Sequence, residues 1–123
     1  MLHSMFPACK EIIVTTPHPV AAFVASRVGV MALRTEHGIF GVVENMAYFE
    51  STRTGSKDYV FGRGGGDMFA AEFQTEVLGR IPLQQPDWNK EDFAPSVYED
   101  THTTGLIYRT IAETVIDKTA FAQ

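Results

Sequence analysis

The residues best placed to do chemistry are an asparagine that ends an apolar segment and a glycine-rich stretch that follows it. Residues 41–49 read GVVENMAYF, and residues 61–67 read FGRGGGD. The first segment predicts a buried strand that ends in a polar residue, and the second predicts a turn that opens a helix. Such strand ends and helix starts are where α/β proteins bind ligands. The sequence contains no G-x-x-x-x-G-K-[ST] phosphate loop, so these glycines are not by themselves an ATP site.

Asn45 lies at the expected carboxyl end of the first of these segments. Its side-chain amide offers one acceptor and two donors, which suit the edge of a purine base. An asparagine at this position can also cap a strand end or a turn, so both roles remain open. Thr15 and Thr16 follow an earlier apolar run and carry a similar but weaker indication.

The glycines of residues 62–66 also have two interpretations. Their backbone N–H groups could bind an anion at the start of the following helix, with Arg63 adding positive charge. Alternatively, the glycines permit a tight turn and a close approach of the backbone to its neighbours. We favour the second interpretation, because no lysine stands at the start of the helix.

Other reactive side chains form no recognisable constellation. Cys9 has no histidine or basic partner nearby that would make it a nucleophile. The histidines are far apart and lack ligand-like spacing to the cysteine, so we expect surface or capping roles for His3, His18, His37 and His102. A solvated loop explains the acidic stretch better than acid–base catalysis does; its members are Asp87, Glu91, Asp92, Glu99 and Asp100.

Strands and helices are expected to alternate along the chain. β-branched and apolar runs predict strands at 11–15, 39–43 and 77–81, and residues 48–61 suggest a small β-ribbon. Helical periodicity predicts helices at 20–34, 66–74 and 104–118, with a long irregular segment at 83–103. This order predicts an α/β fold, in which helices flank a partial, doubly wound parallel sheet.

Apolar stripes mark each of the three expected helices. Gly38 is the expected stop of the first helix. In the second helix, Met68, Phe69 and Phe73 are expected to face inward. The stripe of the first helix is made by Val20, Phe23, Val24, Val28 and Met31, and that of the last by Ile107, Ile111 and Val115.

Composition narrows the class of protein. The chain has 123 residues, 45% of them hydrophobic and 20% charged, which is typical of one globular domain. A net charge of −5 with scattered basic residues argues against a nucleic-acid partner held by phosphate contacts. No apolar run has the length of a membrane span, and the first ten residues do not resemble a signal peptide. A single cysteine excludes an internal disulfide and suits the reducing cytoplasm.

The expected sheet is small for a doubly wound fold. It has three strands, and an initial strand with a phosphate-binding turn is missing. Residues 1–123 therefore read as a single partial domain, the carboxyl half of a larger one. An open sheet edge would remain, which favours dimerisation or pairing with another chain.

Four motifs occur in the order found in Mrp/ApbC proteins, which are MinD/ParA-like P-loop ATPases linked to iron–sulfur cluster carriage. They are residues 11–17 (EIIVTTP), 41–49 (GVVENMAYF), 61–66 (FGRGGG) and 78–83 (LGRIPL). Over nearly its whole length, the chain resembles the carboxyl half of that ATPase domain. The resemblance implies a P-loop fold, ATP and Mg as ligands of the full-length protein and a cytoplasmic dimer that sandwiches ATP. It also implies assembly of iron–sulfur clusters or their transfer to acceptor proteins.

The resemblance also implies roles for four residues. Asn45 matches an asparagine that contacts the adenine in related ATPases, and Ile81, Pro82 and Leu83 match a segment that lines the base pocket. The phosphate loop and the Mg-binding acidic residues would lie upstream of Met1. We therefore do not expect this chain to hydrolyse ATP alone, since nothing in it holds the β- and γ-phosphates or the metal.

One departure from the family pattern concerns the cluster. Many members carry a C-x-x-C pair at the positions that Ser51 and Thr54 occupy here. Hydroxyls are poor iron ligands compared with thiolates, which argues against a cluster bridged by this motif. A second function therefore stays open, that of a MinD/ParA-like module whose nucleotide state controls binding to a partner protein.

Overall fold

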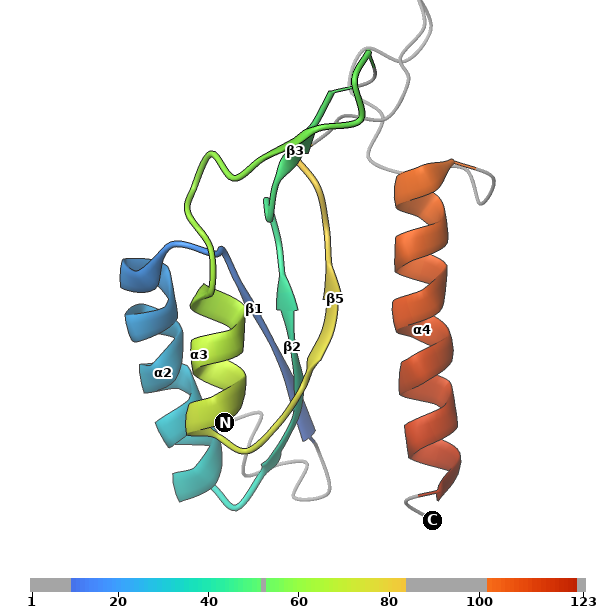
Figure 1. Cartoon of the computed structure of the whole chain (residues 1–123). Helices are drawn as coiled ribbons and strands as arrows, with labels where there is room; N and C mark the ends of the chain where they lie inside the picture. Colours follow the sequence, from blue (N-terminus) through green and yellow to red (C-terminus); the bar gives the residue numbers. More distant parts are fainter. Residues whose placement is uncertain (1–9, 52, 84–101, 122–123) are drawn as a thin grey trace, which may run out of the picture.

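The computed structural model describes residues 10–51, 53–83 and 102–121, and side chains as far as residue 119. Its centre is a parallel sheet of three strands in the order β1-β2-β5. Helices α2 and α3 lie on one face of this sheet and α4 lies on the other (Figure 1). The α/β prediction is therefore confirmed. The element bounds are β1 Lys10–Thr15, α2 Pro19–Arg34, β2 Gly38–Glu44, β3 Phe49–Glu50, β4 Lys57–Asp58, α3 Gly65–Glu72, β5 Val77–Arg80 and α4 Thr103–Phe121.

Two apolar clusters hold the layers together, one on each face of the sheet. Neighbouring residues of β2 point to opposite faces of the sheet, because side chains alternate along a strand. Val42 packs toward α2 and α3, whereas Val43 packs toward α4. The first cluster contains Ile13, Ala25, Val42, Phe69 and Ala70; the second contains Val43, Leu78 and Ile81, covered by Ile107, Ile111 and Val115. The stripe predicted for the last helix is thus confirmed.

Helix α2 begins and ends through local hydrogen bonds. The Val20 N–H donates to His18 Nδ1 over 3.1 Å, and Pro19 occupies the first turn. At the other end the chain reverses at Glu36, whose φ of 62° is left-handed. Gly38 was expected to end this helix. It is instead the first residue of β2, because Glu36 already provides the left-handed turn.

Helix α2 does not bury the apolar stripe that its periodicity predicts. That stripe lies on the exposed face of the helix. The buried positions of the helix are all small: Ala22, Ala25, Gly29 and Ala32. Small residues are required because α2 lies close to its neighbours: a Cβ at Gly29 would lie 2.6 Å from the ring of Phe73. The large apolar residues consequently point away from the sheet, and Phe23 is 64% exposed. The exposed set is Val20, Phe23, Val24, Val28, Val30, Met31 and Leu33, called here the outer face of α2.

Helix α3 also corrects one expectation. Phe69 is fully buried and Phe73 packs beside it, with ring centroids 4.7 Å apart, as predicted. Met68 was expected to face inward but is 57% exposed. The close contact of α3 with α2 and β2 leaves room on its buried face for Gly65, Gly66, Phe69 and Ala70.

Among the described residues, β1 is an edge strand, and its face opposite α2 carries exposed side chains. Within the described part of the chain, it pairs only with β2. Ile13 points into the cluster beneath α2, whereas Ile12 and Val14 are 42% and 63% exposed. Helix α4 packs over β5, and its Lys118 forms an ion pair with Glu76 just before that strand. A parallel strand is normally covered on both faces, and in the described structure β1 departs from that pattern.

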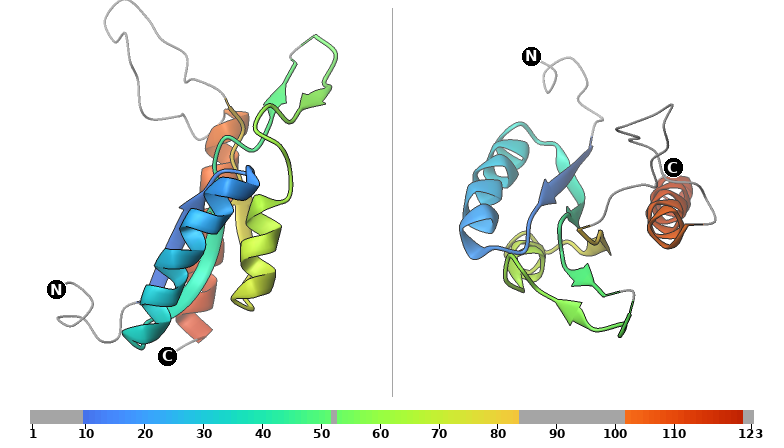
Figure 2. Two further views of the ribbon diagram at one scale, coloured as in Figure 1. Left: turned by 90° about the vertical axis from the view of Figure 1, so that its left-hand side faces the viewer. Right: turned by 90° about the horizontal axis from the view of Figure 1, so that it is seen from above.

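Residues 49–58 form the predicted ribbon, which projects beyond the carboxyl edge of the sheet (Figure 2). Strands β3 and β4 pair antiparallel through Phe49–Asp58 and Glu50–Lys57. A cation–π contact stabilises the base of the ribbon, where Lys57 Nζ lies 4.5 Å from the Tyr48 ring centroid. The expected loop beyond Leu83 lies mostly outside the described residues.

Two glycines of β2 provide a matched test of this packing. A Cβ at Gly41 would lie 2.5 Å from Leu78 Cγ, whereas one at Gly38 would meet Lys10 at an ordinary 3.6 Å. We expect Gly41→Ala to lower the free energy of unfolding by about 1–3 kcal/mol through overpacking. Gly38→Ala should leave it unchanged or raise it by about 0.5 kcal/mol. Urea unfolding followed by circular dichroism measures both, and equal effects would contradict the packing described here.

Candidate functional site

The carboxyl ends of all three parallel strands meet at one edge of the sheet. The turn after β2 is fixed to the turn after β1, because the Asn45 N–H donates to the Thr15 carbonyl over 2.7 Å. Beyond β5 the chain continues as residues 81–83, which run beside residues 44–48. Backbone hydrogen bonds of 2.7–2.8 Å join these segments: Ile81 N–H to Glu44 O, Ala47 N–H to Ile81 O, and Leu83 N–H to Tyr48 O. The structure thus brings the four residues singled out in the sequence to a single edge.

The side chain of Asn45 is partly used in the turn. Its Oδ1 accepts the N–H of Met46 over 3.0 Å, and Met46 has a left-handed φ of 51°. The capping role left open by the sequence is therefore real. No described residue accepts a hydrogen bond from the Asn45 Nδ2 group, and the half-buried amide retains its two donors.

Residues 81–83 shape the edge mainly through their backbone. Ile81 is 7% exposed and belongs to the cluster beneath α4, and Pro82 is also buried. Leu83 is 37% exposed and is the member of the three whose side chain reaches the surface.

The glycine-rich turn receives acceptor groups from the chain itself. The Gly65 N–H donates to the Pro17 carbonyl over 3.0 Å, and the Gly66 N–H donates to Glu44 Oε2 over 2.8 Å. A Cβ at either glycine would lie 2.6 Å from its acceptor oxygen. Arg63 points elsewhere, with its guanidinium 4.1 Å from the Tyr59 ring centroid. These contacts favour the structural interpretation of residues 62–66 over an anion site.

Glu44 is a residue that the sequence reading missed. It ends β2 and is 3% exposed, yet it carries a carboxylate. Its Oε1 lies 3.6 Å from Arg80 Nε, and Arg80 Nη2 reaches Asp67 Oδ1 at 2.5 Å. The sequence feature that could have revealed Glu44 is an acidic residue at the end of an apolar strand, directly before Asn45. The anion at the start of α3 is thus a side chain of this protein.

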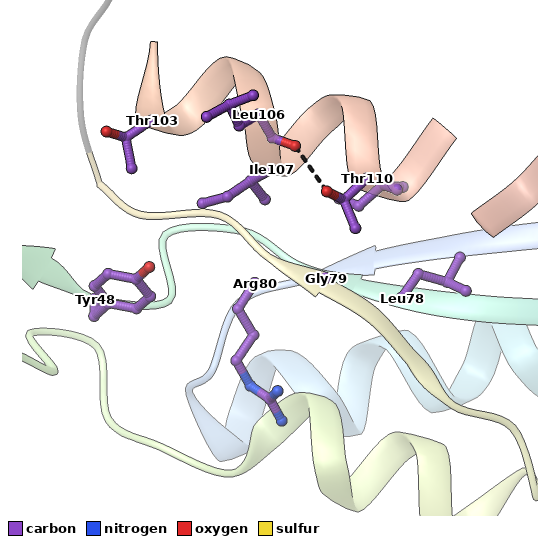
Figure 3. Close-up of a pocket in the computed structure, with 9 residues that line it drawn as sticks. Tyr48, Leu78, Gly79, Arg80, Thr103, Leu106, Ile107 and Thr110 are labelled. Atoms are coloured by element: carbon purple, nitrogen blue, oxygen red, sulfur yellow. Dashed lines mark hydrogen bonds between the residues drawn. The ribbon is translucent and has the colours of Figure 1, made fainter. Parts of the chain in front are cut away.

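A cavity of about 440 Å³ lies next to this edge, between β5 and the first half of α4 (Figure 3). Leu106, Ile107 and Ile111 form much of its wall, and Tyr48 and Arg80 border it from the side of the strand ends. The Thr110 hydroxyl donates to the Leu106 carbonyl over 3.0 Å. The lining is largely apolar, which suits an apolar group more than a phosphate.

The tip of the ribbon holds the two positions compared with a cysteine pair. The Ser51 Oγ accepts the Arg53 N–H over 3.3 Å, and the Thr54 hydroxyl lies 2.9 Å from the Ser56 hydroxyl. Both hydroxyls therefore stabilise the turn. In the part of the chain that the structure describes, no group of three or more His, Cys, Asp or Glu side chains is arranged to hold a metal.

The other reactive residues have local roles or lie outside the described ranges. His18 caps α2, and His102 Nδ1 accepts the Thr104 N–H over 3.1 Å at the start of α4, as expected of capping residues. His37 is buried rather than on the surface. Cys9, His3 and the acidic residues between 87 and 100 lie outside the described residues. None of the helices in the described ranges is long and apolar enough to cross a bilayer.

Comparisons with known proteins identify the family of this chain. The model of the family described as ParA, NUBPL iron-transfer P-loop NTPase, matches residues 1–116. An iron-sulfur cluster carrier protein of Bacillus subtilis is 60% identical over 114 residues, which are 93% of this chain and 32% of that protein. One from Pseudomonas fragi is 33% identical, over 88% of this chain and 38% of its own length. The chain thus spans about a third of these relatives.

A solved structure gives the same result for the fold. The nucleotide-binding protein of Archaeoglobus fulgidus, in complex with ADP, is 37% identical and superposes with a TM-score of 0.51. The match covers 59% of this chain and 30% of that one. Together with the family match over residues 1–116, it confirms the resemblance to Mrp/ApbC proteins. The chain belongs to the ParA, NUBPL-type, family of iron-transfer P-loop NTPases.

Proposed function

We propose that this chain forms the base-recognition side of the nucleotide site in an ATP-dependent iron–sulfur cluster carrier. The observation that carries the proposal is that the turn holding Asn45 is hydrogen-bonded through its flanking residues to residues 81–83 at the shared carboxyl edge. Adenine presents a donor and an acceptor side by side, which an asparagine amide can match with two hydrogen bonds. The Asn45 Oδ1 retains a second lone pair beside its bond to Met46, and Nδ2 retains its donors.

Hydrolysis of ATP is not proposed for this chain by itself. Its sequence contains no phosphate loop, and the N–H group of Gly66 at the start of α3 is paired with Glu44. Contacts to the β- and γ-phosphates and to Mg would have to come from residues other than these. The ADP bound by the A. fulgidus relative supports a nucleotide as ligand of the full-length family protein.

Asn45→Asp and Asn45→Ala separate the two roles of this side chain. We expect adenosine to bind the native chain weakly, with an affinity on the order of millimolar, and to shift the amide signals of Asn45, Ile81 and Leu83 in NMR spectra. Asn45→Asp keeps the acceptor for Met46 but lacks the donors, so its affinity should fall about tenfold with little loss of stability. Asn45→Ala lacks both the acceptor and the donors, so its affinity for adenosine and its stability should both fall.

The control for this experiment is ATP with Mg. Since no phosphate contacts are proposed, ATP should bind the native chain no more tightly than adenosine in calorimetry. Equal adenosine affinity in native protein and Asn45→Asp would remove Asn45 from the site. Micromolar ATP binding would show that this chain, or a second copy of it, supplies phosphate contacts.

Cluster carriage is the second part of the proposal, and it rests on family membership and on the names of the relatives. It includes transfer to acceptor proteins and a place in the reducing cytoplasm. The ribbon tip favours an alternative, a ParA-like regulatory module without a cluster, because Ser51 and Thr54 hydrogen-bond within the turn. Thiolates would be needed there to hold iron and sulfide firmly.

Anaerobic reconstitution with iron and sulfide tests whether the ribbon of this chain holds a cluster. We expect the native chain and Cys9→Ser to bind no stoichiometric cluster at the ribbon, because hydroxyls replace thiolates. The double variant Ser51→Cys/Thr54→Cys should gain iron, sulfide and visible charge-transfer absorption. A cluster in the native chain that Cys9→Ser retains would contradict the assignment of the ribbon as cluster-free and argue against the regulatory alternative.

Self-association is the third part of the proposal. The outer face of α2 and the open edge of β1 expose apolar side chains and unpaired strand groups in the described structure. Burial of such surfaces between copies, or in the family dimer interface, is worth about 25 cal/mol per Å² of apolar area. These surfaces support a homo-oligomer.

Sedimentation of matched aromatic variants tests that association. Phe23 on α2 and Tyr108 on α4 are 64% and 47% exposed. We expect Phe23→Ser to shift the native chain from an oligomer toward the 13.6 kDa monomer. Tyr108→Ser should leave the distribution unchanged. A monomeric native chain at all concentrations would refute the proposal.

A further inference from the structure

Glu44 and Arg80 are linked twice across the edge that carries the proposed base site. Their side chains approach to 3.6 Å between Oε1 and Nε. Their main chains meet as well, because the Glu44 carbonyl accepts the N–H of Ile81, the residue after Arg80, over 2.8 Å. Glu44 directly precedes Asn45, and Arg80 directly precedes Ile81. The pair therefore stands at the start of both segments that face the base.

We propose that Glu44 is a positioning residue for base recognition, holding the Asn45 turn in register with residues 81–83 through Arg80. The inference rests on the function proposed above and adds to it a residue that does not touch the base. Glu44 Oε2 is bound to the Gly66 N–H, so the carboxylate faces α3 and the guanidinium.

The surroundings of this carboxylate make its position stiff. A buried charge is tolerated when it is paired and hydrogen-bonded, and Glu44 has both the start of α3 and Arg80. Space is equally restricted, because a Cβ on Gly66 would lie 2.6 Å from Oε2. Displacing the carboxylate would leave it without these partners, so it resists displacement.

Arg80 transmits this constraint to the end of β5. Its side chain is 44% exposed and is held from a second side by Asp67 of α3, at 2.5 Å. Asp67 is itself 63% exposed, so the solvent-facing half of the arrangement is weaker than the buried half. The buried contact with Glu44 is consequently the one whose loss should release residues 81–83.

Glu44→Gln and Arg80→Gln test the inference in the full chain. In Glu44→Gln, the new side chain retains an acceptor for the Gly66 N–H but lacks the charge that faces Arg80. Hydrogen exchange by NMR reports on the amides of Ile81, Ala47 and Leu83, which bridge the two segments. We expect exchange there to accelerate roughly tenfold or more, because each variant removes one charge of the ion pair between Glu44 and Arg80. The Val42 amide, bonded to the Glu76 carbonyl, should change much less.

A surface ion pair supplies the matched control. Arg109 and Glu113 of α4 form an exposed pair at 3.2 Å, with no contact to the edge. Glu113→Gln should leave the exchange of all four amides unchanged. Adenosine affinity should fall about threefold or more in Glu44→Gln, because the Asn45 turn and residues 81–83 are no longer held in register. It should remain native in Glu113→Gln.

The outcomes separate positioning from general stability. Uniformly faster exchange across the sheet in Glu44→Gln, including at Val42, would overturn the inference, as would native exchange at Ile81 and Ala47. If Glu44→Gln fails to fold, Arg80→Gln decides, because its side chain is partly exposed and its loss leaves the Gly66 bond in place. If native protein binds no adenosine, the proposed function fails, whereas the exchange pattern still decides whether Glu44 fixes this edge.

Discussion

The buried carboxylate of Glu44 is the interaction on which the arrangement of the strand ends depends. It satisfies the N–H of Gly66 at the start of α3 and attracts the guanidinium of Arg80 at the end of β5. Two elements distant in sequence, α3 and β5, are thereby tied to the last residue of the central strand. A charge at this depth is stable only with such partners, so its presence restricts how α3, β2 and β5 can be arranged.

Close backbone approach is the second constraint, and it explains the unusual face of α2. Gly65 and Gly66 bring the start of α3 against Pro17 and Glu44, and Gly29 lets α2 approach Phe73. Helices that lie this near to one another and to the sheet leave room for alanine and glycine between them. The larger side chains are then excluded to the outside, where they provide the surface from which we infer association.

Family membership and geometry contribute different things to the functional reading. The family match brings nucleotide and iron–sulfur chemistry into consideration, although the chain spans about a third of its curated relatives. Geometry joins residues 44–48, the turn that holds Asn45, to residues 81–83 through backbone hydrogen bonds. An apolar cavity bordered by Tyr48 lies next to this edge. It also shows that Ser51 and Thr54 close a turn with their hydroxyls. Both parts of the proposal take their chemistry from the family, and the geometry adds the candidate residues for nucleotide recognition.

The sequence by itself determined the alternation of strands and helices, the parallel sheet and the family, because these depend on local periodicity and on short ordered motifs. It also predicted the stripe of Ile107, Ile111 and Val115. Only the tertiary structure decided which face of α2 is buried, that Met68 is exposed, and that Glu44 rather than a ligand occupies the start of α3. The physical reason is that periodicity gives the spacing of apolar residues along an element. Interlayer distances and the pairing of a buried charge depend on contacts between segments far apart in the chain.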